Sequence, residues 1–104
     1  RGAENIPVVE VEEVLYRHEA IEDAAIVAMP DERLGERACV FITLRPDQII
    51  TFAELTAYLT EQKMAKQYFP ERLEIIETMP RTPSGKIQKF RLREIAQNFT
   101  VRRC

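Results

Sequence analysis

The sequence predicts an α+β domain, in which a small antiparallel sheet of about three strands, with a short hairpin, is covered by about three helices. Apolar residues recur near helical spacing in three segments, and short β-prone runs lie between these segments. The resulting order is helix, strand, strand, helix, strand, turn, helix. With 104 residues, of which 45% are hydrophobic, the chain fits one compact domain with a modest core.

The first predicted element is a helix in PVVEVEEVLYRH, residues 7–18. Its apolar face is formed by Val8, Val11 and Leu15. Pro7 suits the first helical position, because its fixed φ matches the helix and its missing amide hydrogen would have no partner there. We therefore expect the helix to begin at Pro7.

Three glutamates and the only histidine of the chain lie on this helix. Glu10, Glu12 and Glu13 are favourable near the positive N-terminal end of the helix dipole. Adjacent helix positions point in different directions, so we expect a solvated face and not a carboxylate site. For His18, a role at the helix end or on the surface is favoured over catalysis.

Two strands are predicted next, in AAIVAMP and RACVFITL, with the turn-rich DERLGE between them. They are expected to be antiparallel neighbours. RLEIIETM predicts a third strand, residues 72–79, that Pro80 stops.

Two further helices complete the fold. Thr51 and Glu54 form a capping box, and Ile50 is placed to contact Leu55 as a hydrophobic staple. This helix is predicted to run to about residue 62, with Phe52, Leu55 and Leu59 on one apolar face. In the last helix, the residues at helical spacing are Leu92, Ile95, Ala96 and Phe99.

The composition narrows the class of protein. No apolar run approaches the roughly 18 residues of a membrane span, and the first residues lack the regions of a signal peptide. Neither Cys39 nor Cys104 has a metal-site spacing or implies a disulfide framework, so a cytoplasmic, reducing environment is expected. The chain lacks an initiating methionine and is expected to be a piece of a longer protein.

Charge is unevenly distributed although the net charge is only -2. Residues 1–60 carry 5 Lys/Arg and 12 Asp/Glu, whereas residues 61–104 carry 10 and 5. A nucleic-acid-binding domain is usually basic overall. The basic C-terminal half therefore favours local phosphate or acyl-anion chemistry.

The stretch PRTPSGKIQK, residues 80–89, places a lysine at the tip of a turn. A phosphate-binding P-loop needs glycine five residues before Gly85 and Ser or Thr after Lys86, but Pro80 and Ile87 stand there. Turns favour Ser and Gly for backbone reasons alone, so an idle, solvated lysine is the plain alternative. The surroundings favour a presented lysine, because five cations and no acid lie within thirteen residues: Arg81, Lys86, Lys89, Arg91 and Arg93.

PRTPSGKIQK resembles the C-terminal signature of the adenylate-forming enzymes, which are acyl-CoA synthetases, nonribosomal peptide adenylation domains and luciferases. RGAENIPVVEVEEVL resembles the segment that follows that family's hinge between its large N-terminal and small C-terminal domains. EDAAIVAMPDERLGERACVFITL resembles the family's next strands and loop. The resemblance covers residues 1–99 in order.

The resemblance implies that residues 1–104 are the single C-terminal (lid) domain of a two-step ligase, whose large N-terminal ATP- and acid-binding domain is absent from this chain. The full-length enzyme would use ATP (with Mg²⁺) to activate a fatty, alicyclic or aromatic carboxylic acid as acyl-AMP, and would then transfer the acyl group to CoA. Its own N-terminal domain would be the partner, with no nucleic acid and no metal site in this chain. The isolated piece is expected to be inactive and to bind no cofactor.

The resemblance also assigns site residues. Lys86 would contact the carboxylate and phosphate oxygens during adenylation, supported by Arg81, Ser84 and Gly85, and is expected to be exposed and poorly ordered in this chain alone. The loop that would line the tunnel for the thiol consists of Gly2, Ala3, Glu4 and Asn5. The alternative that Gly2 and Asn5 only shape the entry to the first helix stays open. Ala3 replaces a frequent glycine of the family, and Pro7 stands one residue early.

Other functions remain open. RGAENI and RTPSGKIQKFRLR look more like medium-chain acyl-CoA synthetases than like peptide synthetase modules. A peptide synthetase adenylation domain or a luciferase-type enzyme would carry the same motifs. A free-standing anion-binding interaction module, using the basic C-terminal half, is the alternative of a different class.

Overall fold

The computed structural model describes residues 6–31 and 35–103, and the side chains of residues 31, 35 and 99–103 lie outside this description. It confirms the α+β class. Its elements are α1 (Val8–Tyr16), β1 (Ile21–Asp31), β2 (Gly35–Leu44), α2 (Phe52–Glu61), the short 3-10 helix η2 (Lys66–Tyr68), β3 (Arg72–Ile75) and α3 (Lys89–Arg103).

Helix α1 begins one residue later than predicted. Pro7 is its N-cap, and its carbonyl accepts the first helical hydrogen bond from the Val11 amide at 3.0 Å. The helix ends at Tyr16, two residues earlier than predicted, where the Arg17 and His18 amides donate to carbonyls three residues back. Such tighter bonds are common in the last turn of a helix.

The sheet has the strand order β1-β2-β3. Strands β1 and β2 pair antiparallel, as predicted, from Ile21 opposite Leu44 to Asp31 opposite Gly35. Strand β3 pairs parallel to β2, which corrects the prediction of an antiparallel sheet. The reason is the connection: α2 and η2 lie between β2 and β3 and return the chain to the end of the sheet from which β2 started, as parallel strands require. Strand β3 is also four residues shorter than predicted.

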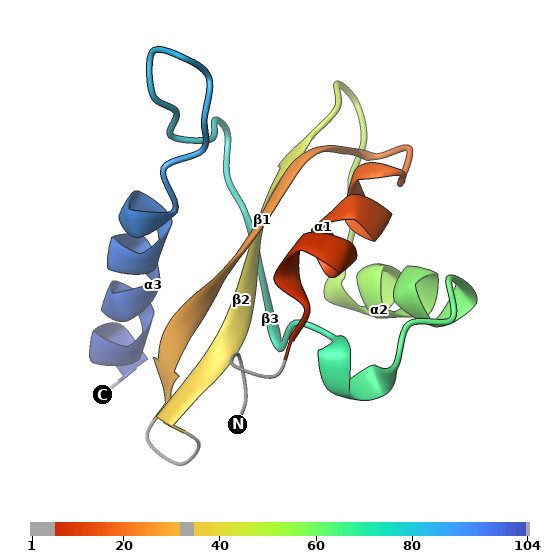
Figure 1. Cartoon of the computed structure of the whole chain (residues 1–104), viewed down its shortest axis with the longest axis horizontal. Coiled ribbons are helices and arrows are strands. Elements are labelled where there is room, and N and C mark those ends of the chain that lie inside the picture. The colour runs from red at the N-terminus through yellow and green to blue at the C-terminus, as the bar shows by residue number, and fades with distance from the viewer. Residues whose placement is uncertain (1–5, 32–34, 104) are drawn as a thin grey trace.

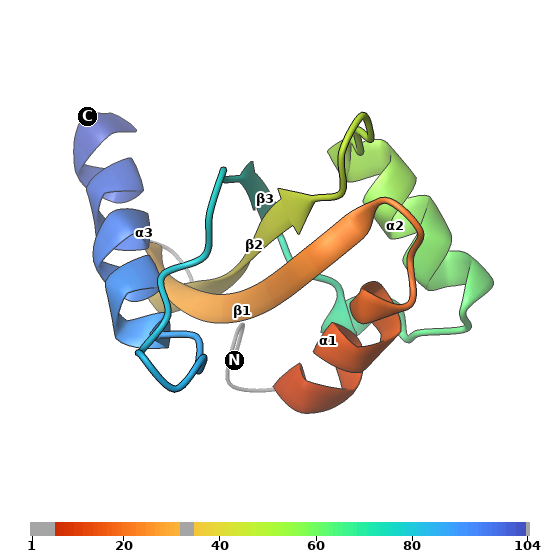
Figure 2. The same ribbon diagram turned by 90° about the horizontal axis from the view of Figure 1, so that it is seen from above.

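Helices cover both faces of the sheet (Figures 1 and 2), with α1 and α2 on one side and α3 on the other. The core is accordingly divided into two clusters. Cluster 1 contains Val11, Leu15, Ile26, Val40, Leu55 and Leu59, among others. Cluster 2 contains Val27, Cys39, Phe41, Met79, Leu92 and Ala96, among others. The alternation of side chains along β1 and β2 supplies both clusters from the same two strands.

The start of α2 follows the prediction. The Glu54 amide donates to Thr51 Oγ1 at 3.1 Å, and Glu54 Oε1 accepts from the Thr51 amide at 2.9 Å, which completes the capping box. Ile50 is buried in the same cluster as Leu55. Phe52, predicted on the buried face, is instead 42% exposed.

Helix α3 contacts β1 through Leu92 and Ala96, which are fully buried. Ile95, predicted on the same face, is 40% exposed, so the buried contact of α3 is narrower than predicted. The side chain of Phe99 lies outside the described part.

Candidate functional site: the lysine loop

Residues 80–89, here called the lysine loop, connect the segment after β3 to α3 and project from the rest of the fold (Figure 1). An antiparallel bridge joins Arg81 and Ile87, which confirms the predicted short hairpin. Inside it, the Thr82 amide donates to the Lys86 carbonyl at 2.8 Å, and the Gln88 amide donates to the Pro80 carbonyl at 2.9 Å. The loop therefore has a defined backbone path.

The tip of the loop depends on a glycine and two hydroxyl groups. Gly85 has φ +98°, a conformation that side chains with a Cβ rarely adopt. A Cβ at this position would meet nothing within 4 Å, so the requirement for glycine is conformational and not steric. Thr82 Oγ1 accepts from the Lys86 amide at 3.1 Å and lies 3.0 Å from Ser84 Oγ. These contacts fix the backbone of Lys86.

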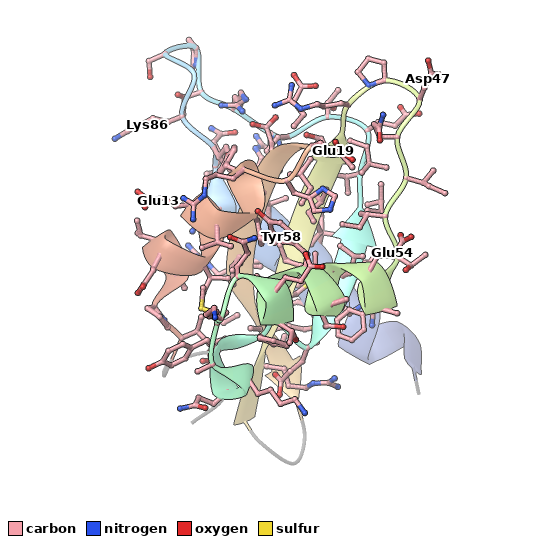
Figure 3. The ribbon with its side chains drawn as sticks, turned by 90° about the vertical axis from the view of Figure 1, so that its right-hand side faces the viewer. Glu13, Glu19, Asp47, Glu54, Tyr58 and Lys86 are labelled. Atoms are coloured by element: carbon pink, nitrogen blue, oxygen red, sulfur yellow. The ribbon has the colours of Figure 1, made fainter. Side chains whose placement is uncertain are left out.

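The Lys86 side chain is exposed, as predicted. Figure 3 shows it pointing away from the body of the domain. Within the described part of the chain, its ammonium group has no carboxylate partner. An unpaired cation on a braced loop can meet an anion that lies outside this domain.

Arg81 connects the loop to the sheet. Its Nη1 donates to the Gly85 carbonyl at 2.5 Å, and its Nη2 donates to Asp23 Oδ1 at 2.5 Å. The other oxygen of Asp23 accepts from Thr43 Oγ1 at 3.1 Å. One guanidinium group thus joins β1 to the carbonyl that immediately precedes Lys86.

Glu12 differs from the prediction. Instead of lying on a solvated face, its side chain is only 15% exposed, and Oε2 accepts from the Ile26 amide and from Lys89 Nζ, both at 2.8 Å. The physical reason is that β1 is an edge strand, whose outward amide has no strand partner, and α1 lies beside that edge. Lys89, the first residue of α3, therefore ties the far end of the loop to α1.

Tyr16 lies within the same group of charges. Burial raises the pKa of Tyr16, and the carboxylates of Asp23 and Glu12 act in the same direction. A hydrogen bond to the Ala24 backbone and the charge of Arg81 lower this pKa in part. The phenol therefore stays protonated, and the lysine loop meets α1 and β1 through a cluster of one phenol, two acids and two cations.

His18 takes part in a packing contact. Its Nδ1 accepts from the Ala20 amide at 3.0 Å, and its ring meets the Tyr58 ring edge-on at 4.6 Å. The Tyr58 hydroxyl donates to the Val14 carbonyl at 2.8 Å. This arrangement holds the end of α1 against α2.

An open pocket of about 400 Å³ lies at the base of the loop, between residues 76–80 and α3. Ile76, Thr78 and Pro80 line one side, and Arg91, Glu94 and Ile95 line the other. The sequence signal for it is Ile95, which is predicted on the apolar face of α3 but lines this pocket.

Several predicted features lie elsewhere. The loop of Gly2, Ala3, Glu4 and Asn5 is outside the described residues. Among residues 6–31 and 35–103, no group of three His, Cys, Asp or Glu side chains is placed to hold a metal ion. The described helices include none that is long and apolar enough to cross a membrane.

Comparison with known proteins places this geometry in a family. Residues 10–86, from the first turn of α1 to the loop lysine, match the model of the AMP-binding enzyme C-terminal domain. The chain belongs to this family.

The relatives of this AMP-binding enzyme C-terminal domain include both CoA ligases and AMP ligases. The chain is 48% identical over its whole length to a medium-chain fatty-acid–CoA ligase of Escherichia coli, and covers 19% of that protein. It is 48% identical to a 2,3-dihydroxybenzoate-AMP ligase of Bacillus subtilis over 90% of this chain and 17% of that one. The chain thus spans about a fifth of the length of the curated relatives it matches.

Solved structures agree with the fold of this AMP-binding enzyme C-terminal domain. A crystal structure of the anthranilate CoA ligase AuaEII in complex with anthranoyl-AMP superimposes with a TM-score of 0.81 at 34% identity. That match covers 92% of this chain and 19% of that chain. The Mycobacterium smegmatis MbtA apo structure gives a TM-score of 0.82 at 35% identity, over 90% of this chain and 18% of that chain.

Proposed function

We propose that this chain is the mobile C-terminal lid domain of an acyl-CoA synthetase. The full-length enzyme would use ATP (with Mg²⁺) to convert a carboxylic acid to acyl-AMP and would then pass the acyl group to the thiol of CoA. Similarity to a medium-chain fatty-acid–CoA ligase over the whole chain supports this proposal. The observation that carries it is Lys86, an exposed cation on a loop that is hydrogen-bonded through its backbone.

The proposed role of Lys86 follows from the charges in the first reaction. The carboxylate of the acid attacks the α-phosphorus of ATP, a C–O–P linkage forms, and pyrophosphate leaves. Two anions must approach each other, so a cation held at the oxygens where charge develops lowers the barrier. Because Lys86 projects from this domain, it would act in an active site formed with the large N-terminal domain.

For the second step, the proposed thiol loop is the segment Gly2, Ala3, Glu4 and Asn5. Its glycine would permit close approach of the pantetheine chain to the backbone. Arg81, Ser84 and Gly85 belong to the first step, because their contacts are with the lysine loop.

Replacing Lys86 tests the proposal. In the full-length enzyme, Lys86→Ala should slow acid-dependent ATP–pyrophosphate exchange by about 10²- to 10³-fold, or about 3–4 kcal/mol, as expected for the loss of one preorganised electrostatic group. Lys66→Ala is the matched control, since Lys66 is exposed on η2, and it should leave the exchange rate unchanged. An undiminished rate for Lys86→Ala would refute the assignment.

A second candidate is an enzyme that forms an aryl-AMP without CoA as the acceptor. The 48% identity to a 2,3-dihydroxybenzoate-AMP ligase favours it. Incubating the full-length enzyme with candidate acids, ATP and CoA distinguishes the two: accumulation of acyl-CoA supports the CoA ligase, whereas AMP ester that persists in the presence of CoA supports the second candidate. Salt-sensitive oligonucleotide binding by the chain would instead favour an anion-binding module.

A further inference from the structure

Two ion pairs fasten the lysine loop, one at each end. Arg81, the second residue of the loop, pairs with Asp23 of β1, and Lys89, the last residue, pairs with Glu12 of α1. Both acids are largely shielded from water, with side chains 18% and 15% exposed. Their cations, Arg81 and Lys89, are 40% and 34% exposed, so both pairs are partly buried, and partly buried pairs are screened less by salt than fully exposed ones.

A bulge in β1 turns the Asp23 side chain toward the lysine loop. A register shift separates Ile21, opposite Leu44, from Asp23, opposite Thr43. Ile21 is buried in cluster 1, beneath α1 and α2, whereas Asp23 is in phase with residues of cluster 2 on the α3 side. In a regular strand, residues two apart would lie on the same face. The bulge therefore buries Ile21 on one face while turning Asp23 toward the loop, a use of bulges that recurs near functional sites.

The carboxylate of Asp23 is oriented by donors on both of its oxygens. Thr43, itself buried, donates to Oδ2, and Arg81 donates to Oδ1. Arg81 then donates its second Nη to the Gly85 carbonyl. The planar guanidinium group makes this a stiff connection from the sheet to the residue before Lys86.

The acid at the other end, Glu12, is held by two donors on one of its oxygens. Glu12 Oε2 accepts from the Ile26 amide of β1 as well as from Lys89 Nζ. The anchor therefore joins α1, the edge of β1 and the first turn of α3. These two acids balance Arg81 and Lys89, while Lys86 between them has no such partner in the described part of the chain.

We propose that Asp23 and Glu12 are positioning residues for Lys86: they fix the two ends of the loop so that its ammonium group keeps one place relative to the domain. This inference rests on the proposed function of Lys86. A loop held in this way loses less conformational freedom when Lys86 meets the reacting oxygens, so part of the catalytic effect depends on the two acids.

The test uses the full-length enzyme with Asp23→Asn and Glu12→Gln, which keep the shape of each side chain and remove its charge. Asp23→Asn should lower kcat of ATP–pyrophosphate exchange at least tenfold while KM for the acid changes less than threefold. Transfer to CoA from supplied acyl-adenylate should stay within twofold, because the proposed function assigns that step to residues 2–5 and not to the lysine loop. Glu12→Gln should give the same pattern with a smaller loss.

Glu13→Gln is the matched control, because Glu13 is the exposed neighbour of Glu12 on α1 (Figure 3) and should leave both half-reactions unchanged. Hydrogen exchange of the peptide covering residues 80–89 should accelerate in Asp23→Asn and Glu12→Gln. The peptide from α2 should not change, which separates loosening of the loop from a loss of overall stability.

The outcomes separate the two proposals. If Lys86→Ala leaves the exchange rate intact, the proposed function fails. If Lys86→Ala slows it but Asp23→Asn does not, or Asp23→Asn slows it without faster hydrogen exchange at residues 80–89, the positioning role fails. If Asp23→Asn also speeds hydrogen exchange in α2, a second variant, Arg81→Lys, tests the positioning role. It keeps a cation beside Asp23 but removes the hydrogen bond from the guanidinium group to the Gly85 carbonyl. A wild-type rate in Arg81→Lys would then overturn the inference.

Discussion

Cys39 gives the fold a dependence on alkaline pH. Burial raises the pKa of its thiol from 9.0 to about 12, and the Glu74 carboxylate adds to the rise while Arg72 opposes it. Above pH 9 the thiol ionises in the unfolded chain but stays protonated in the folded chain. The stability that this burial contributes is therefore complete below pH 9 and is lost as the pH rises toward 12.

We predict that the unfolding free energy of the wild-type chain falls more steeply between pH 9 and 11 than that of Cys39→Ala, by up to about 1.4 kcal/mol per pH unit. Urea titrations at pH 8, 9, 10 and 11 measure the two slopes. Tyrosines, lysines and Cys104 are present in both chains, so their contributions cancel in the comparison. Parallel curves for the two chains would contradict the prediction.

At the residue scale, the sequence predicts the exposed lysine loop better than the contacts that hold it. Lys86, Arg81 and Gly85 lie in one short stretch whose prolines and glycine already indicate a presented turn. Asp23 is 58 residues away from Arg81, and the direction of its side chain depends on a bulge that no local pattern reveals. The prediction of a solvated Glu12 was wrong, because helical spacing does not reveal that the unpaired edge of β1 lies beside this side chain.

At the element scale, the start of α2 is the helix boundary that the local sequence predicts most clearly, because Thr51 and Glu54 form a capping box there. The Thr51 side chain satisfies an amide that has no partner within the helix. Thr51→Ala should lower the unfolding free energy by about 1 kcal/mol. Thr60→Ala is the control: Thr60 is exposed in the same helix and donates to the Thr56 carbonyl, so its removal should change the free energy by a few tenths of a kcal/mol at most. Equal losses in urea titrations would argue against the cap.

Strand β3 is the element that the sequence predicted least well. Its β-prone residues indicated a strand but carried no information on direction, because direction is set by where α2 and η2 deliver the chain. The prediction also extended the strand to residue 79, whereas pairing ends at Ile75 opposite Ile42. Residues 76–78 instead leave the sheet and line the pocket, and Met79 packs in cluster 2 before the chain enters the lysine loop.

At the scale of the whole molecule, one sheet joins two apolar clusters that share no helix. Cluster 2 holds α3 through Leu92 and Ala96, and cluster 1 holds α1 and α2. Both clusters draw on alternate residues of the same two strands, so neither can lose its packing without exposing one face of β1 and β2. The two sides should therefore unfold together.

Leu92→Ala tests this coupling. Removing a fully buried side chain should lower the unfolding free energy by about 2–5 kcal/mol, whereas Ile95→Ala, at the exposed rim of the same helix, should cost less than about 1 kcal/mol. In urea, tyrosine fluorescence reports the side of α1 and α2, because Tyr16 lies on α1 and Tyr58 and Tyr68 pack against cluster 1. Far-ultraviolet circular dichroism reports all three helices. Coincident midpoints in Leu92→Ala, both shifted downward, are expected. An early loss of helix signal with an unshifted tyrosine transition would mean that α3 detaches by itself, and the lysine loop would then be anchored to a helix of independent stability.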